Sequence, residues 1–510
     1  MFTEIRSLFQ PRSELSPEER QKGLKLVIWD GICSQAMVAL QGGVFLVAFA
    51  LALGATNFEI AILASIPFLA QISQLLAIYI IEEIRNRKAI TVAFASASRL
   101  AWLIIIFIPF IFLGKQGITI LIFALFTSSL IGAVAGNSWN STLRDLIPEK
   151  IMGALFSRRM MLGTGVALAL TLLGGYFIDF WKSGHNELHA YSILFTGGLV
   201  FGLVGMYFLS NTPEPAMEAK KGRQSLRELL AHPFADRNFR SLILFSATWS
   251  FAINLAAPFF TVYMLKRLEL DIFLVTIFIT ISQVSNILFL RIWGRFCDRF
   301  SNKSVLSVSG TLFLVVIIAW TFTTMPEKYF LTLPLLVLIH ILGGISLAGV
   351  SLASGNISLK LSPRGQAAAY LASHGLISSL AAATAPLLGG LLADFFAVRE
   401  LSFSFSWAEP GRELALYALN FKALYFLFFF AFIIGLYSLR RLASVKEEGE
   451  VTEDIVVQEL MAEMAGGTRN LSSVEGLRYL TLFPLHLATR TLHTISRARS
   501  PRQRTPRPKQ

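Results

Sequence analysis

Two charged side chains, Asp30 and Arg99, lie inside long apolar runs, where a charge needs a partner or a cavity. Arg99 follows Lys88 by 11 residues, which is about 16 Å along a helix. An arginine at that depth in a membrane costs roughly 2.5–3.5 kcal/mol on insertion scales, so it normally faces a partner or a water-filled space. Asp30 lies about five residues, or ~8 Å, inside its own run. Its carboxylate could bind a proton or a cationic substrate, partner Arg99, or simply lie at the membrane interface.

A short charged loop, RIWGRFCDRFSNK at 291–303, separates two long apolar runs, and a weaker echo, IEEIRNRK, occupies 81–88. A carboxylate at the end of one helix can pair with arginine or accept N–H groups from the start of a neighbouring helix. Such contacts could form a cytoplasmic gate that closes in one state and opens in another. The alternative is that these charges only set the topology. The candidate gate residues are Glu82, Arg87, Gly294, Asp298, Arg299 and Lys303.

A second similarity links the two halves of the chain. LGGYFIDF at 173–180 matches LGGLLADF at 388–395, an offset of 215, and Pro148 and Pro363 share that offset. Paired glycines permit close helix packing. The repeated positions are Gly174, Gly175, Asp179, Gly389, Gly390 and Asp394. The two aspartates fit either an outer gate or a plain interfacial position. Three matches near one offset predict two halves of the same design in parallel orientation.

The elements that must position these residues are membrane helices. Hydrophobic residues make up 54% of the 510, charged residues 15%, and mean hydropathy is +0.60. The apolar residues form runs of about 20, the length that crosses a hydrocarbon layer. We therefore expect an all-α polytopic membrane protein with twelve transmembrane helices in two pseudo-symmetric six-helix bundles. The expected spans are 27–53, 58–81, 89–113, 117–142, 159–181, 190–210, 241–265, 271–292, 304–324, 331–357, 375–398 and 417–439.

Loop charges predict the orientation. Loops after even-numbered spans contain 19 lysines and arginines, and loops after odd-numbered spans contain 7. The positive-inside rule then places both termini in the cytoplasm. We expect the protein in the cytoplasmic (inner) membrane. The expected divisions are an N-terminal segment (1–26), a first bundle (27–210), a central loop (211–240), a second bundle (241–440) and a tail (441–510). Topology accounts for the net charge of +13, so no nucleic-acid partner is expected.

Over residues 20–440 these features resemble the major facilitator superfamily. The family loop reads Gly-x-x-x-Asp-Arg/Lys-x-Gly-x-Arg/Lys-Arg/Lys. The second copy keeps Gly294, Asp298, Arg299 and Lys303, with Ser301 in place of the second glycine. The first keeps only Glu82 and Arg87, with Ile78 at the first glycine. The resemblance implies a gating role for Asp298 and a weaker one for Glu82. APLLGG at 385–390 resembles the Gly-Pro-x-x-Gly-Gly motif of antiporter members, with Ala in place of the first Gly. In those members the motif lies in the N-terminal half, whereas here it lies in the C-terminal half, so it is weak evidence for export.

The resemblance also implies a central cavity lined by spans one, four, seven and ten. Polar and aromatic residues on those spans predict a mixed substrate site, although each also fits as a contact between helices. Together with Asp30 and Arg99, the candidates are Gln35, Gln41, Asn137, Trp139, Asn140, Trp249, Asn254, His340 and Asn356. His340 could carry a proton or be a hydrogen-bonded core histidine.

Motifs for phosphate loops, zinc hydrolysis and nucleophile elbows are absent, which argues against an enzyme. We expect no cofactor and no metal site. The expected function is secondary active transport of a small solute by a monomer in the lipid bilayer, through alternating access, with proton coupling at Asp30 as a hypothesis. The alternative is a scaffold for assembly or sensing that does not transport, suggested by the tail. That tail is expected to hold an amphipathic helix at 474–495 and a basic disordered end.

Overall fold

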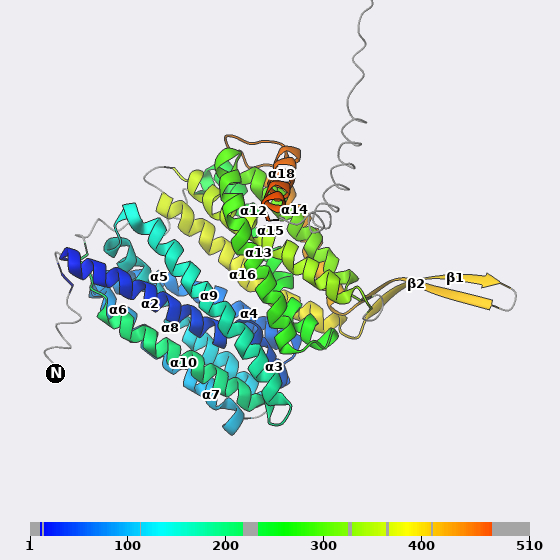
Figure 1. Cartoon of the computed structure of the whole chain (residues 1–510), viewed down its shortest axis with the longest axis horizontal. Coiled ribbons are helices and arrows are strands. Elements are labelled where there is room, and N and C mark those ends of the chain that lie inside the picture. The colour runs from blue at the N-terminus through cyan, green and yellow to red at the C-terminus, as the bar shows by residue number, and fades with distance from the viewer. Residues whose placement is uncertain are drawn as a thin grey trace, which may run out of the picture.

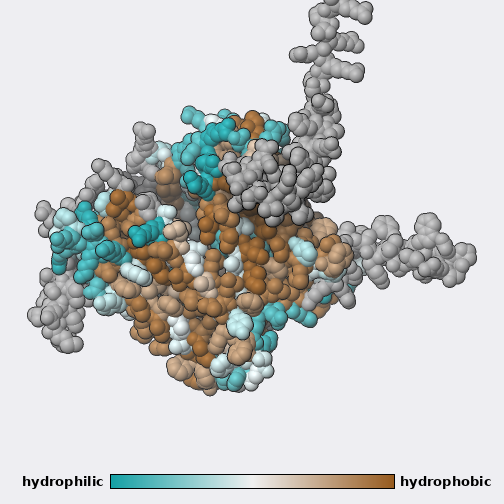
Figure 2. All heavy atoms as spheres, in the orientation of Figure 1, coloured by the Kyte–Doolittle hydropathy of each residue, from teal (hydrophilic) through white to brown (hydrophobic). Residues whose placement is uncertain are grey.

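The computed structural model describes residues 11–12, 15–112, 114–217, 233–324, 329–363, 367–409 and 412–471. These form two helical halves and one β-hairpin (Figure 1). Among them, 11 helices are long and apolar enough to cross a membrane. Figure 2 shows apolar surface over the middle of both halves and hydrophilic surface at their ends. The all-α polytopic class is confirmed.

The N-terminal half consists of nine α-helices and one 3₁₀ turn among the described residues. They are α2 (Pro17–Gln41), α3 (Gly43–Ala52), α4 (Asn57–Ala70), η1 (Gln71–Ser73), α5 (Gln74–Ile84), α6 (Arg87–Leu100), α7 (Trp102–Ile111), α8 (Lys115–Leu146), α9 (Glu149–Lys182) and α10 (Glu187–Asn211).

The C-terminal half begins after the central segment. Its elements are α12 (Arg237–Val262), η2 (Tyr263–Arg267), α13 (Ile272–Arg299), α14 (Asn302–Ala319), η3 (Trp320–Phe322), α15 (Thr332–Lys360), α16 (Ala367–Phe396), β1 (Glu400–Glu409), β2 (Arg412–Lys422), α17 (Leu424–Leu442) and α18 (Glu453–Leu471).

The two halves meet along two helix pairs, α4 with α16 and α9 with α13. In Figure 1 the starts of α2 and α6 lie far from α14 and α18. We call the side that carries these elements the terminal face, and the side that carries the starts of α4 and α13 the opposite face. The halves therefore join near the opposite face and diverge toward the terminal face.

Several boundaries differ from expectation. A capping box begins α2: Ser16 accepts the N–H of Glu19, and the Glu19 carboxylate accepts the N–H of Ser16. This helix starts at Pro17 and continues without a break into the first span, which was expected to begin at residue 27. The expected span at 58–81 is covered by α4, η1 and α5, broken by a short 3₁₀ turn.

The last expected span starts later than 417. Residues 400–409 and 412–422 form an antiparallel hairpin, β1 with β2, that projects from the helices, and α17 begins at Leu424. Its serine-aromatic alternation (SFSFSW at 402–407) has the period of a strand rather than of a helix. In the tail, α18 lies against α14. The amphipathic helix expected at 474–495 and the basic end lie outside the described residues.

Candidate functional site

The opposite face holds two carboxylates that cap helices of the other half. Asp179, near the end of α9, accepts the backbone N–H of Phe273 at 2.7 Å and of Ile272 at 3.3 Å. These two N–H groups lie at the start of α13, where a helix leaves its donors unpaired and its dipole attracts negative charge. Asp179 therefore ties the N-terminal half to the C-terminal half.

Asp394 makes the same contact in the reverse direction. Near the end of α16, it accepts the N–H of Phe58 at 3.1 Å and the side-chain amide of Asn57 at 2.8 Å, at the start of α4. The two sets of positions differ by 215 throughout, as 394 does from 179 and 273 from 58. We call these contacts the two interhalf caps. The repeat read from the sequence is thus also a repeat in space.

The repeated glycines bring the capped helices together. A Cβ on Gly175 would lie 2.6 Å from the hydroxyl of Thr276 on α13, and one on Gly390 would lie 2.6 Å from Cβ of Ala61 on α4. Only glycine fits at such distances without a shift of the neighbouring helix. Their neighbours Gly174 and Gly389 face the cores of their own halves, against Phe45 and the carbonyl of Leu255.

On the terminal face, a carboxylate caps a helix start within the N-terminal half. Glu214 accepts the N–H of Arg87 at 2.7 Å and of Lys88 at 3.1 Å, the first two residues of α6. The buried Arg87 side chain donates to the Asp145 carboxylate at 2.5 Å and to the Pro215 carbonyl at 2.7 Å. Arg87 therefore fastens α6 to the end of α8 and to the segment after α10.

The C-terminal half repeats this cap with different charges. Glu447, after α17, accepts the N–H of Lys303 at 2.7 Å, the Asn302 side-chain amide at 2.8 Å and the Lys360 ammonium at 2.8 Å. Asn302 stands 215 positions after Arg87, and Lys360 stands 215 positions after Asp145. The basic residue beside the capping glutamate is therefore Arg87, at the helix start, in the N-terminal half, and Lys360, at the end of α15, in the C-terminal half. In both halves the capping carboxylate belongs to a glutamate that follows the last membrane helix of that half.

The pKa values of the two capping glutamates shift in opposite directions. Burial raises the pKa of Glu214 in spite of its two N–H bonds, since its nearest guanidinium nitrogen, Arg87 Nε, is 3.5 Å away. Burial also acts on Glu447, but hydrogen bonds from Lys360, Lys303 and Asn302 outweigh it and lower the pKa of Glu447. A close ammonium partner makes the difference.

The predicted gate residues are only partly brought together. Lys303 and Arg87 lie in the caps just described, while Gly294 packs near Leu352 and Arg299 pairs with Glu459 of α18. Asp298 is exposed and makes no hydrogen bond or ion pair with any residue that the structure describes. The Glu82 side chain lies outside the described part of the structure.

The alignment of the two loops also changes by one residue. Helices α5 and α13 end at Ile84 and Arg299, an offset of 215 rather than 216. Glu83, not Glu82, therefore occupies the position equivalent to Asp298. Asn86 and Ser301 are the matching N-caps of α6 and α14, which explains the serine in place of the family glycine.

Asp30 lies in a cavity inside the N-terminal half. Its buried carboxylate is 3.7 Å from Nη2 of Arg159, a residue of α9 that is absent from those predicted for this site. The buried Arg99 lines the same cavity, of about 200 Å³, but no hydrogen bond joins it to Asp30. The two residues are thus neighbours across a cavity, and the ion pair goes to Arg159.

Unpaired polar atoms gather around this Asp30 cavity. Asp30 Oδ1, Arg99 Nη1, Arg159 Nε, Trp139 Nε1 and Thr91 Oγ1 are all buried without a partner, and all five residues line it. A buried polar atom without a hydrogen bond costs about 1–3 kcal/mol. Five around one cavity indicate a site for a polar ligand or for water.

The corresponding site in the C-terminal half is uncharged. His374 stands 215 positions after Arg159, and its Nε2 lies 2.7 Å from the hydroxyl of Ser246 on α12. Asp30 itself corresponds to Phe245. The offset identifies Arg159 as one of the positions at which the halves differ in charge, a signal that the sequence already contains.

The other predicted substrate residues do not form one cluster. Gln35 lines a separate cavity of about 300 Å³ between α2, α9 and α13. Gln41 is buried and donates to the Phe195 carbonyl at 3.1 Å, and Asn137 and Asn254 donate to carbonyls of their own helices at 2.9 and 2.8 Å. Asn140 and Asn356 are exposed.

His340 and Trp249 lie in the core of the C-terminal half. His340 Nδ1 lies 2.8 Å from the Leu336 carbonyl, and its ring stacks on Phe278. Trp249 is buried against Phe245 and Phe313. The geometry of His340 matches a hydrogen-bonded core histidine. Among the described residues, no group of three or more metal-ligating side chains could hold an ion.

Comparison with known proteins gives the family and the fold. The family model described as Major Facilitator Superfamily matches residues 31–343 and 242–451. No curated protein matches the chain.

Solved structures with the same fold include three transporters. The nucleoside transporter NupG has a TM-score of 0.60 at 13% identity and covers 84% of this chain and 100% of its own. A bacterial homologue of the iron transporter ferroportin, in an inward-facing state, has a TM-score of 0.58 at 12% identity, and the match covers 85% of this chain and 100% of that one. A POT family transporter in complex with a thioalcohol-conjugated peptide has a TM-score of 0.56 at 16% identity, and the match covers 87% of this chain and 100% of that one.

The family match spans most of the chain and the fold agrees with it across both halves, so this protein belongs to the Major Facilitator Superfamily of membrane transporters.

Proposed function

We propose that the protein is a secondary active transporter of a small solute, working by alternating access with both termini in the cytoplasm. The terminal face is then cytoplasmic, and the structure corresponds to the state that is closed on the outer side. Carriers with parallel repeats work by rocking one half against the other around a site near the membrane midplane.

The observation that carries this proposal is the pair of interhalf caps. Asp179 and Asp394 close the outer side by contacts that cross between the halves, whereas Glu214 and Glu447 act within one half. Contacts across the halves must break when the outer side opens, and contacts within a half can persist. The caps therefore have the placement of a gate with two discrete states.

A reversible crosslink across one cap tests this. Cysteines replace Asn57 and Asp394, on a background in which Cys33 and Cys297 are changed to alanine. A bis-methanethiosulfonate reagent joins them through two disulfides, with sulfinate as the leaving group, and a reductant cleaves the bridge. Proteoliposomes are supplied with an isotope-labelled metabolite extract, and mass spectrometry identifies the solutes taken up. Crosslinking should stop that uptake, and cleavage should restore it.

The N57C single variant, treated in the same way, is the control because it cannot form the bridge. Uptake that continues at full rate in the crosslinked protein contradicts alternating access. A protein that moves no solute before crosslinking contradicts transport itself.

We further propose that the Asp30 cavity couples the solute to a proton. Arg99 and Arg159 face one carboxylate there, so the cavity has one excess positive charge, and a second when Asp30 is protonated. Protonation would release Arg159 from its ion pair and free both guanidinium groups for an anionic group, which arginine holds by paired hydrogen bonds. The proposed solute therefore carries a negative charge and binds together with a proton.

The Asp30→Asn variant separates coupling from binding. A proton gradient should no longer drive accumulation, while exchange of solute across the membrane without a gradient should survive. Accumulation that still follows the proton gradient in this variant would refute the role of Asp30. Ser34→Ala, a polar change at the same cavity that leaves all three charges, is the matched control.

A further inference from the structure

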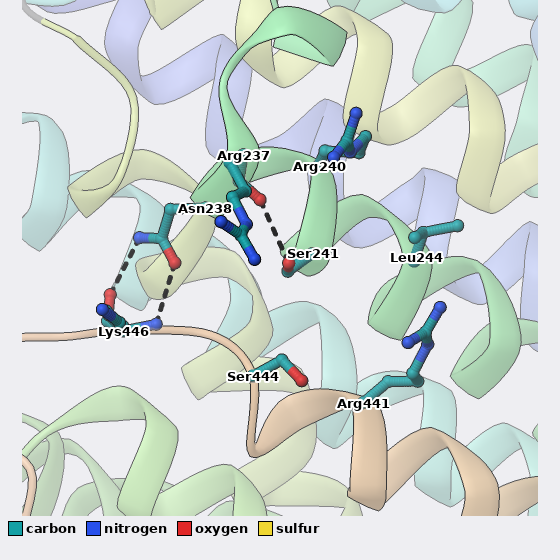
Figure 3. A pocket seen from close by; sticks show the side chains of 8 residues that line it. All are labelled: Arg237, Asn238, Arg240, Ser241, Leu244, Arg441, Ser444 and Lys446. Atoms are coloured by element: carbon teal, nitrogen blue, oxygen red, sulfur yellow. Dashed lines mark hydrogen bonds between the residues drawn. The ribbon is translucent and has the colours of Figure 1, made fainter.

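A basic pocket opens on the terminal face between the start of α12 and the end of α17 (Figure 3). Its volume is about 570 Å³. The lining residues are Arg237, Asn238, Arg240, Ser241, Leu244, Arg441, Ser444 and Lys446. Four of these eight side chains are cationic and none is acidic. The pocket lies away from Asp30 and from both interhalf caps, so the proposed transport cycle does not explain it.

Within the described ranges, the arginines of this pocket have no acidic partner. Arg237, Arg240 and Arg441 form no ion pair with any residue in the described ranges. The nearest acid in sequence, Asp236, caps the start of α12, where its Oδ1 accepts the N–H of Asn238 at 2.8 Å and of Phe239 at 3.0 Å. Their positive charge is thus left for a ligand.

The walls of the pocket are held in place. Asn238 exchanges two hydrogen bonds with the Lys446 backbone, at 2.8 and 2.9 Å, which fixes the segment after α17 to the start of α12. Figure 3 shows Arg237 from one helix and Arg441 from the other projecting toward the space between them. Arg237 and Arg441 therefore approach the pocket from two different helices rather than lying in a row on one.

The pocket borders exposed side chains with large apolar parts. Leu244, which lines it, is 42% exposed, and Tyr437, one turn deeper on α17, is 50% exposed. The Arg441 guanidinium lies 5.6 Å from the centre of the Tyr437 ring. Positive charge thus sits directly above exposed apolar side chains, which is the arrangement of a headgroup above an acyl chain. A free anion would use the charge and leave the apolar surface uncovered.

We propose that this basic pocket binds the phosphate headgroup of an anionic phospholipid. Arginine forks match phosphate oxygens by paired hydrogen bonds, and basic pockets between membrane helices on the cytoplasmic side bind anionic headgroups. Ser241, Ser444 and Asn238 add neutral hydrogen-bonding groups around the charge. A bound headgroup would bridge α12 and α17 and fasten the first residues of the tail.

The test uses the full-length protein in nanodiscs of phosphatidylcholine, with or without phosphatidylglycerol, followed by native mass spectrometry of the retained lipid. The triple variant R237Q/R240Q/R441Q should retain at least tenfold less phosphatidylglycerol than the unchanged protein. The matched control is R144Q/R158Q, which removes exposed arginines from the same face but outside the pocket, and it should retain lipid normally.

Equal retention in the triple variant, or equal loss in both variants, would overturn the proposal. Inorganic phosphate at millimolar concentration is the second arm. If it protects Arg237 and Arg441 from arginine-directed reagents as well as phosphatidylglycerol does, the pocket binds free anions and the lipid assignment is wrong. Should the triple variant fold poorly, L244E, which introduces an acid and leaves all the cations, must also abolish retention.

Discussion

Removing both interhalf caps should open the outer side of the protein. Asp179 is half-buried and accepts two N–H bonds, so its loss costs the closed state about 1.5–3 kcal/mol, the range for hydrogen bonds to a charged group. Asp394 is exposed and contributes about 1 kcal/mol. The two losses together are about 2.5–4 kcal/mol, and since 1.4 kcal/mol is tenfold in an equilibrium, D179N/D394N should shift the balance between the two states by roughly 60- to 700-fold.

The shift can be read at Thr276, which is buried against Gly175 at the α9–α13 contact. Thr276→Cys, in a protein whose Cys33 and Cys297 are replaced by alanine, should react slowly with an impermeant maleimide added from the outer side. In the D179N/D394N background, labelling should be faster by a factor near the shift in population.

Asp271→Asn is the matched control for this measurement. Asp271 is an exposed acid at the start of the same helix, α13, but its side chain caps nothing. That variant should label at the original rate. Unchanged labelling in D179N/D394N, or equal acceleration in D271N, would refute the assignment of the caps as a gate.

Three further predictions concern packing, buried charge and pH. Gly175→Ala places a methyl against Thr276 and should disfavour the closed state by about 1–3 kcal/mol, measured by the same labelling, whereas Gly165→Ala, on the same helix with open space around it, should have no effect. Arg87→Gln breaks a buried network and should cost about 3 kcal/mol of unfolding free energy, seen as a lower melting temperature in detergent, while Arg299→Gln, in an exposed pair, should cost less than about 1 kcal/mol. Because the pKa of Glu447 lies below its ordinary value of 4.5, its contribution to stability is complete above that pH and is lost as the pH falls through the lowered pKa. The protection of α18 and the start of α14 against hydrogen exchange, corrected for the intrinsic pH dependence of amide exchange, should therefore fall on acidification, and Glu447→Gln should remove that dependence.

The repeat in the sequence predicted more of the site than the motif did. The offset of 215, read from the Gly-Gly-x-x-x-Asp segments, also relates Asn57 to Ile272, Phe58 to Phe273 and Arg159 to His374. The loop motif drew attention to Asp298 instead, and that residue is exposed and unpaired among the described residues. A motif shows which residue types occur in a loop, but the state of the protein decides which of them are in contact.

The partners of the charged residues could not be read from the chain. Asp30 pairs with Arg159, 129 positions away, because α2 packs along α9, and Glu447 reaches Lys303 because the segment after α17 folds back over α14. Helix packing brings these groups together, and hydropathy contains no information about which face of a span meets which neighbour. For the same reason the sequence could not show that Gln41, Asn137 and Asn254, candidates for the substrate site, bond to nearby carbonyls.

The sequence by itself determined the membrane class, most span positions and the two-fold repeat, because hydrocarbon requires apolar runs of a fixed length and each helix satisfies its own backbone locally. Tertiary structure alone decided which carboxylate caps which helix, which arginine pairs with Asp30, and where, among the described residues, arginines lie without an acidic partner. Those outcomes depend on how two bundles pack and tilt against each other, and long-range contacts of that kind are set by the fit of side chains across helices rather than by any local pattern.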